Sequence, residues 1–343
     1  MPLTPAHRPS FLTPHAKGVL AAVVTVVIWT AFIVVARASA DPARGGVLNP
    51  FDIVYARIWG ASLVLLPWGW WLVRRARRMQ PAAGSFLGLS PLPLRTTVQV
   101  GFFGGLLYAM LAYSGFVFAP AAHASVLMPG SLPLWTALLA IGVLGDRMTR
   151  TRALGLVFIV GGDVMVGGSS LLHALDGSGV WRGDLLFMGA SFVWSIYSVL
   201  ARRFALQAVQ ATIAITVFAF CTYVPVYTAL LLLQWVPGQV LQAPWTAVGF
   251  QMLMQGVGSV VISGISFTRM IQHFGPVRST MITALVPGLS AMAAVIFLGE
   301  PLGWNLVVGL VLVTAGILFG VRQSKQVAPD LGAAPALSTG SKA

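Results

Sequence analysis

The sequence contains little charge, and least of all negative charge. Only 8% of its 343 residues are charged, and 8 Asp and Glu residues stand against 21 Lys and Arg. A soluble domain carries about 25% charged residues. Hydrophobic residues make up 57% of the chain, which is more apolar surface than a water-soluble fold can bury, so lipid must be part of the solvent. The composition excludes an ordinary soluble domain and predicts an integral membrane protein.

Cysteine and clustered acidic groups are also scarce. Cys221 is the only cysteine, which excludes an intrachain disulfide and a cysteine metal site. The acidic residues are scattered, whereas an integral-membrane enzyme needs acidic, His or Cys groups gathered at one face. We therefore expect no enzymatic activity, no metal and no cofactor, and we keep such an enzyme only as an alternative.

The basic residues are distributed as a membrane protein requires. A net charge of +13 is also found in nucleic-acid-binding proteins, but here basic residues form short clusters between apolar runs, such as Arg74, Arg75, Arg77 and Arg78. This placement predicts no nucleic-acid partner. Apolar runs of about 20 residues cross a bilayer as helices, and we expect ten of them in an all-α fold. They are 18–36, 53–73, 97–117, 124–144, 152–170, 183–201, 210–234, 246–268, 278–298 and 303–321.

The charges also predict the orientation of the chain. With the N-terminus in the cytoplasm, three basic residues, Arg37, Arg44 and Arg182, fall on the opposite side of these ten spans. Arg57 lies within a span, and every other Lys and Arg falls on the cytoplasmic side, as the positive-inside rule requires. The distribution predicts that both termini are cytoplasmic. The polar segments 1–17 and 322–343 are predicted to be disordered tails.

The first apolar run has some features of a cleaved signal peptide. Residues 19–36 precede Ala38-Ser39-Ala40, which resembles a signal-peptidase site. The run is longer than the usual ~7–15 residues of a signal core, and it has a counterpart later in the chain. We therefore interpret it as the first membrane helix.

The chain contains an internal repeat. Two sets of residues recur, each at a constant offset. Gly18, Trp29 and Arg37 match Gly183, Trp194 and Arg202 at an offset of 165; Ser125, Pro133, Gly145, Gly155 and Gly162 match Ser279, Pro287, Gly299, Gly309 and Gly316 at an offset of 154. Five spans per repeat is an odd number, so the halves 18–170 and 183–321 must cross the membrane in opposite senses. Inverted repeats of this kind are typical of transporters.

The repeated residues form recognisable motifs. Trp29 and Trp194 lie in the helices that open each half, Pro50 and Arg57 begin the second helix, and one longer pattern occurs twice. Its first copy has Ala124-Ser125, Pro133, Leu144-Gly145-Asp146-Arg147, Gly155 and Gly161-Gly162, and its second has Pro276, Ser279, Pro287, Leu298-Gly299-Glu300-Pro301, Gly309 and Ala315-Gly316. Over about residues 17–322 the chain resembles the ten-helix EamA-type members of the drug/metabolite transporter superfamily. It departs from their usual Gly-Glu pair at Gly145-Asp146.

The resemblance implies a secondary carrier of the inner membrane, often an exporter of a small polar metabolite, an amino-acid-like solute or a drug. It also implies that the first four helices of each half line a central cavity, while the fifth is peripheral. The expected partners are the lipid bilayer and a small-molecule solute; a coupling proton and a homodimer are left open. A non-transporting membrane assembly subunit is a further alternative.

Two charged residues lie clearly inside the spans, where charge costs about 2.5–3.5 kcal/mol at mid-bilayer and is therefore a functional candidate. Arg57 either contacts an anion or carboxylate or is a structural arginine paired with Glu300. Asp163 is either a coupling site or a structural group paired with Arg57. The structural interpretation is favoured for Asp163, because the resemblance makes its helix peripheral and its repeat equivalent is Ile317.

Six aromatic residues are candidates to stack on a ring-bearing or cationic substrate. They are Trp29, Trp194, Tyr108, Tyr113, Trp135 and Tyr197. Membrane aromatics more often form interfacial belts, as we expect for Trp68, Trp70 and Trp71, and Trp29 and Trp194 are also explained by packing. Pro133 and Pro287 are predicted to interrupt their helices. Matched breaks in the two halves indicate a site near the midplane, although a simple kink is the alternative.

Overall fold

The computed structural model describes residues 13–40, 46–80, 85–172 and 179–322. Helix α1 begins at Pro14, inside the segment predicted to be a disordered tail, and the remaining tail residues 1–12 and 323–343 lie outside the described ranges. Within these ranges the chain forms helices and no β-strand.

The described helices join into ten rods, five in each half. In the first half they are α1 (Pro14–Ala40), α2 (Pro50–Met79), α3–η2–α4 (Leu94–Gly101, Phe102–Leu106, Leu107–Phe118), α5–η3–α6 (Ala121–Ser125, Val126–Gly130, Leu132–Leu144) and α7 (Arg150–Leu172). In the second half they are α8 (Val180–Arg203), α9 (Ala208–Leu232), α10–η4–α11 (Trp245–Gln251, Met252–Ile262, Ser263–Phe274), α12–η5–α13 (Pro276–Ile282, Thr283–Leu285, Val286–Leu298) and α14 (Trp304–Arg322). Each predicted span coincides with one rod.

Eight of the described rods are long and apolar enough to cross a membrane. The other two are α2, which contains Asp52 and Arg57 and ends in an arginine cluster, and α14, whose apolar part is the shorter Trp304–Phe319. The all-helical, multi-span membrane fold is therefore confirmed. That all ten rods cross the membrane stays a prediction.

Local sequence signals explain where several helices begin and end. Asn49 caps α2, because its Oδ1 accepts from the N–H groups of Phe51 at 2.8 Å and Asp52 at 2.9 Å, while the Asp52 carboxylate accepts from Asn49 N at 3.2 Å. Helices α6 and α13 end at the repeat-related Gly145 and Gly299, whose φ values of 70° and 63° are left-handed. A glycine adopts this C-cap conformation without the steric cost of a Cβ.

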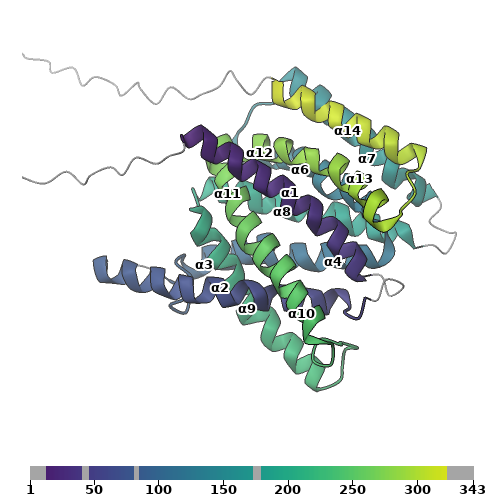
Figure 1. Cartoon of the computed structure of the whole chain (residues 1–343). Helices are drawn as coiled ribbons and strands as arrows, with labels where there is room; N and C mark the ends of the chain where they lie inside the picture. The colour runs from purple at the N-terminus through teal and green to yellow at the C-terminus, as the bar shows by residue number, and fades with distance from the viewer. Residues whose placement is uncertain (1–12, 41–45, 81–84, 173–178, 323–343) are drawn as a thin grey trace, which may run out of the picture.

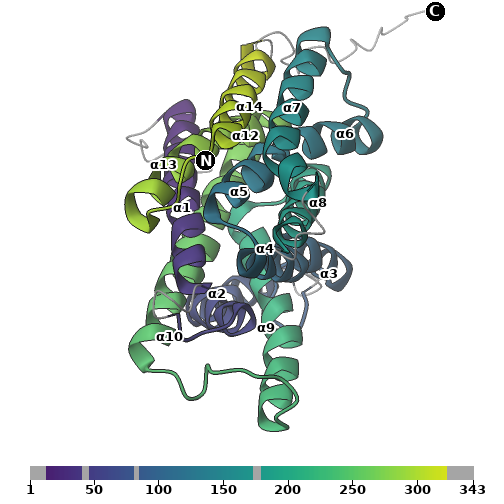
Figure 2. The ribbon, with the colours of Figure 1, turned by 90° about the vertical axis from the view of Figure 1, so that its right-hand side faces the viewer.

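In each half, the opening helix packs against helices of the other half. Helix α1 packs on α11 and α13 of the second half, and its counterpart α8 packs on α4 and α6 of the first. Helix α2 contacts α9, and α7 lies along α14 at the edge of the molecule (Figures 1 and 2). Each opening helix therefore packs against the opposite half, and the two halves meet at the centre of the molecule.

The surface of the α2 end fits the predicted aromatic belt. Trp68, Trp70 and Trp71 are exposed there. The Arg74 guanidinium carbon lies 4.2 Å from the Trp70 ring centroid, and that of Arg75 lies 5.5 Å from Trp71. Tryptophan next to arginine is typical of a membrane–water interface.

Candidate functional site

The irregular segments lie at corresponding places in the two halves. The π-helical segments η2 and η4 interrupt the third rod of each half, and η3 and the 3-10 segment η5 interrupt the fourth. Pro133 and Pro287 are each the second residue of the helix that follows the break, so the predicted interruptions are present. Irregular backbone at membrane depth is tolerated where it is buried or lines a cavity, and π-helical turns are frequent at functional sites.

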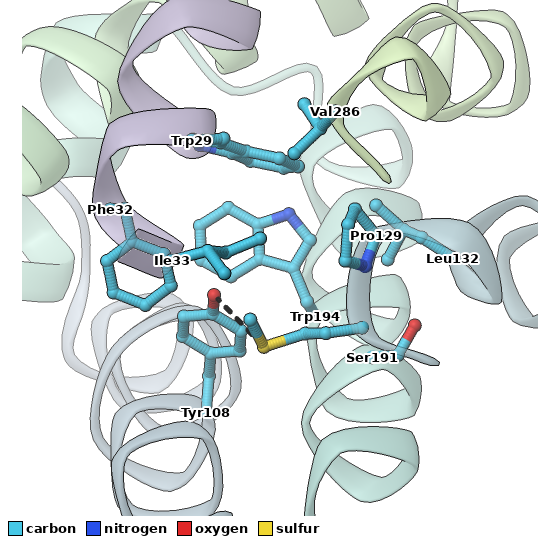
Figure 3. A pocket seen from close by; sticks show the side chains of 10 residues that line it. Trp29, Phe32, Ile33, Tyr108, Pro129, Leu132, Ser191, Trp194 and Val286 are labelled. Carbon is cyan, nitrogen blue, oxygen red and sulfur yellow. Dashed lines mark hydrogen bonds between the residues drawn. The ribbon is translucent and has the colours of Figure 1, made fainter. Parts of the chain in front are cut away.

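A first cavity lies between the opening helices of the two halves (Figure 3). The Trp29 ring of α1 and the Trp194 ring of α8 meet there edge to face, with centroids 5.8 Å apart. Trp29 Nε1 donates to Ser263 Oγ at 3.3 Å. The cavity is lined by Trp29, Phe32, Ile33, Tyr108, Met128, Pro129, Leu132, Ser191, Trp194 and Val286. The breaks before α6 and α13 both contribute to it, through Pro129, Leu132 and Val286.

A second cavity shares Trp194 with the first. It extends from Trp194 toward α2, α9 and the π-helical segments η2 and η4. Its lining consists of Val54, Arg57, Ile58, Ala61, Gly104, Gly105, Leu106, Ala109, Trp194, Tyr197, Thr212, Ile215, Thr216, Ala219, Ser259, Val260 and Gly264. Residues from both halves therefore surround two neighbouring cavities that have Trp194 in common.

Arg57 is the cation of this region, and its partners are neutral. The residue is only 7% exposed. Its Nη1 donates to Tyr113 Oη at 3.1 Å and Ser259 Oγ at 3.2 Å, and its guanidinium carbon lies 6.0 Å from the Phe32 ring centroid. Among the described residues it forms no ion pair. The predicted alternative of a pair with Glu300 is wrong, because Glu300 Oε1 lies 3.4 Å from Arg37 Nε instead.

Three further polar groups of this region lack a partner in the described part of the chain. They are Thr216 Oγ1, Trp194 Nε1 and Gln255 Nε2, and all three are buried. Gln255 is connected to Arg57 through Tyr113, whose Oη donates to Gln255 Oε1 at 2.9 Å. Each of these groups can donate a hydrogen bond, so the region around Arg57 is rich in donors and poor in acceptors.

Asp163 lies elsewhere. It is buried in α7, the helix that packs along α14, and it lines neither cavity. Its carboxylate oxygens have no hydrogen-bond partner among the described residues. The suggested pair with Arg57 is not formed.

The remaining predicted residues divide between the cavities and their surroundings. Tyr108 lines the first cavity, where its hydroxyl lies 3.9 Å from Met128 Sδ, and Tyr197 lines the second, with its hydroxyl 2.8 Å from Thr268 Oγ1. Tyr113 lines neither cavity, and its hydroxyl accepts a hydrogen bond from Arg57. Pro133, Pro287 and Trp135 line neither cavity, although Leu132 and Val286 next to the prolines do.

Sequence reasoning missed three polar residues. Ser259 contacts Arg57, and Thr212 and Thr216 line the second cavity. The two threonines are four residues apart in an otherwise apolar span, and Ser259 follows Gly256-Val257-Gly258. Such isolated hydroxyls are weak signals, because most membrane Ser and Thr residues bond back to their own helix.

Among the described residues, two arginine–carboxylate ion pairs connect the halves and are related by the internal repeat; His123 Nδ1, 2.9 Å from Asp184 Oδ1, is a further contact between the halves. Arg37 Nε lies 3.4 Å from Glu300 Oε1, and Arg202 Nη1 lies 3.3 Å from Asp146 Oδ2. Arg202 matches Arg37 at the offset of 165, and Glu300 matches Asp146 at the offset of 154. The side chains of the Arg37–Glu300 pair are less exposed than those of the Arg202–Asp146 pair. Arg37 also donates to Phe116 O at 3.1 Å, and Glu300 accepts from the N–H groups of Ala121 at 3.3 Å and Ala122 at 3.2 Å.

Comparisons with known proteins agree with the resemblance seen in the sequence. The model of the EamA-like transporter family matches residues 16–168 and again residues 181–322. The uncharacterized transporter YyaM of Bacillus subtilis (strain 168) is 25% identical over 229 residues, which are 64% of this chain and 69% of that protein. An uncharacterized transporter of Archaeoglobus fulgidus is 24% identical over 211 residues, which are 61% of this chain and 65% of its own.

A solved crystal structure shares the fold with a TM-score of 0.60 at 20% identity, covering 89% of this chain and 97% of the other. The family model matches most of the chain, in the same two stretches that contain the repeated Trp, Pro and Gly positions. The chain belongs to the EamA-like transporter family.

Proposed function

We propose that this protein is a secondary transporter of the inner membrane that exports a small solute by alternating access. In this proposal all ten rods cross the bilayer, the halves 18–170 and 183–321 are inverted, and both termini are cytoplasmic. The observation that carries it is the region around Trp194, which helices of both halves enclose. Rocking one half against the other changes the walls of such a region, as alternating access requires.

Arg57, Trp29, Trp194, Tyr108 and Tyr197 are the proposed solute contacts, because each lines at least one of the two cavities. Tyr113 positions Arg57 through its hydroxyl. Pro133 and Pro287 contribute through the breaks beside them rather than through direct contact.

The repeat-related ion pairs are the proposed closures of the two ends. The charge distribution puts Arg37 and Glu300 at the outer end and Asp146 and Arg202 at the cytoplasmic end. Their side chains are 24% and 12% exposed at the outer end, against 47% and 24% at the cytoplasmic end. The described conformation therefore holds its outer end more firmly than its inner end.

The direct test is solute flux in sealed vesicles that contain the purified protein. A panel of labelled metabolites is followed with and without an imposed pH gradient, and protein-free vesicles are the control. We expect saturable movement of at least one solute. Folded protein that moves no member of a broad panel contradicts the carrier function.

Asp163 is tested by the same assay. A coupling role predicts that Asp163→Asn abolishes accumulation driven by a pH gradient, while downhill exchange persists. We expect accumulation close to that of wild type, because Asp163 lines neither cavity and the isosteric Asn removes a buried carboxylate that has no described partner. Loss of gradient-driven accumulation in a folded variant assigns the coupling site to Asp163.

A further inference from the structure

The central region carries one positive charge and no described negative charge to balance it. Arg57 lines the second cavity, and no Asp or Glu lines either cavity. The nearest acidic residue along its helix, Asp52, is used at the end of α2, where its carboxylate accepts from Tyr227 Oη and the N–H of Gln239, each at 2.9 Å. Burying an unpaired charge is costly unless a partner of opposite sign enters the site.

The guanidinium presents part of its hydrogen-bonding capacity to the cavity. The bonds to Tyr113 and Ser259 both use Nη1, so Nε and Nη2 have no partner among the described residues. Two adjacent N–H donors in a fixed plane match the two oxygens of a carboxylate. Thr216 Oγ1, which also lines the second cavity, is a further unpaired group beside this space.

Apart from a few hydroxyl groups, the rest of the lining of the two cavities is apolar and aromatic. Trp194 belongs to both cavities, and the first cavity continues from it to Trp29 and Tyr108 (Figure 3). The Tyr108 and Trp194 ring centroids are 4.7 Å apart. Rings in this arrangement offer an apolar body a surface to pack on, and no described carboxylate lines either cavity to pair with an ammonium group.

We infer that this site takes a solute with one carboxylate, no fixed positive charge and an apolar or aromatic body, an inference that rests on the proposed carrier function. The carboxylate binds Arg57, and the body extends past Trp194 toward Trp29. A phosphate monoester brings a second negative charge that Arg57 alone does not balance. A zwitterionic amino acid brings an ammonium group beside its carboxylate, and therefore beside Arg57, where no described carboxylate receives it.

The test uses four ligands with the same phenyl body and different charges: 3-phenylpropanoate, 3-phenylpropanamide, phenylalanine and 2-phenylethyl phosphate. Radiolabelled 3-phenylpropanoate is bound to the wild-type protein in lipid nanodiscs, and the other three compete. We expect 3-phenylpropanoate to bind about thirtyfold more tightly than the amide, because this is the smallest loss of affinity usual when a buried charge loses its partner. We also expect it to bind more tightly than phenylalanine and the phosphate. Equal affinity for the amide or for phenylalanine, or no binding of any of the four, overturns the inference.

Variants assign the preference to Arg57. Arg57→Gln is expected to bind the carboxylate and the amide equally, whereas Arg57→Lys, which keeps the charge but not the planar fork, retains part of the preference. Arg203→Gln, at the exposed end of α8, is the matched control and keeps the full preference. A folded Arg57→Gln that still prefers the carboxylate shows that Arg57 is a structural residue, and overturns the inference. The ligand series on wild-type protein decides the same question if this variant does not fold.

Flux measured on the same ligands separates the two proposals. Arg57-dependent binding of 3-phenylpropanoate without its movement across vesicles contradicts the carrier function and leaves the chemistry of the site intact. Movement of the neutral amide that is unaffected by Arg57→Gln overturns the inference about the solute and leaves the carrier function intact.

Discussion

Gly60→Ala should abolish most transport and lower the stability of the protein, although it adds only one methyl group. A Cβ on Gly60 would clash with the backbone carbonyl of Met252, where α2 crosses η4. On the other side of this crossing, a Cβ on Gly256 would lie 2.8 Å from the carbonyl oxygen of Arg57. Small residues allow membrane helices to approach this closely. Because the backbone cannot move aside as a flexible side chain does, we expect the free energy of unfolding to fall by about 1–3 kcal/mol, as it does for overpacked cores.

The effect on transport should exceed the effect on folding. Gly60 is one turn after Arg57, and Ser259, which binds Arg57, is on the opposing segment. Separating α2 from η4 therefore pulls Arg57 away from one of its two hydrogen-bond partners. Thermal unfolding and initial flux rates measure the two effects. Gly249→Ala, where an added Cβ meets nothing within 4 Å, is the matched control; equal behaviour of the two variants contradicts the close crossing.

Much of this fold could be predicted from the sequence, because the bilayer restricts what an apolar chain can do. All ten predicted spans coincide with helices, and their ends differ by at most six residues. The differences have local causes. Helix α2 continues to Met79, past its predicted end at residue 73, because arginine is a good helix former and the helix therefore extends beyond the apolar run.

The site was less predictable, because pairing depends on which helices face each other. Glu300 was a reasonable partner for Arg57, since both were expected near the outer side. The exchange of helices between halves instead brings α1 to the end of α13, so Glu300 meets Arg37. Likewise, Trp135 and Trp194 are both intramembrane tryptophans, but the first packs on Phe192 with centroids 5.4 Å apart and the second faces the cavities. No periodicity in one helix distinguishes these cases.

Glu300→Gln should open the outer end of the transporter. The substitution removes the charge from a group that accepts hydrogen bonds from Arg37, Ala121 and Ala122. Loss of one hydrogen bond to a charged group costs about 1.5 kcal/mol or more, which corresponds to about a tenfold shift between two conformations. Asp146→Asn, its repeat-related counterpart, should shift the equilibrium less and in the opposite direction, because exposed ion pairs contribute only about 0–1 kcal/mol.

The single cysteine makes this shift measurable. Cys221→Ser removes the native thiol, and Ser191→Cys then places a reporter in the first cavity with little change in size. The rate at which a membrane-impermeant maleimide labels residue 191 from the outer side of sealed, oriented vesicles reports how often that end opens. We expect the rate to rise about tenfold in Glu300→Gln and to fall slightly in Asp146→Asn. The two acidic residues occupy equivalent repeat positions at opposite ends, so only an alternating mechanism changes the labelling rate in opposite directions in the two variants. Equal labelling rates in the two variants, or changes in the same direction, contradict this mechanism.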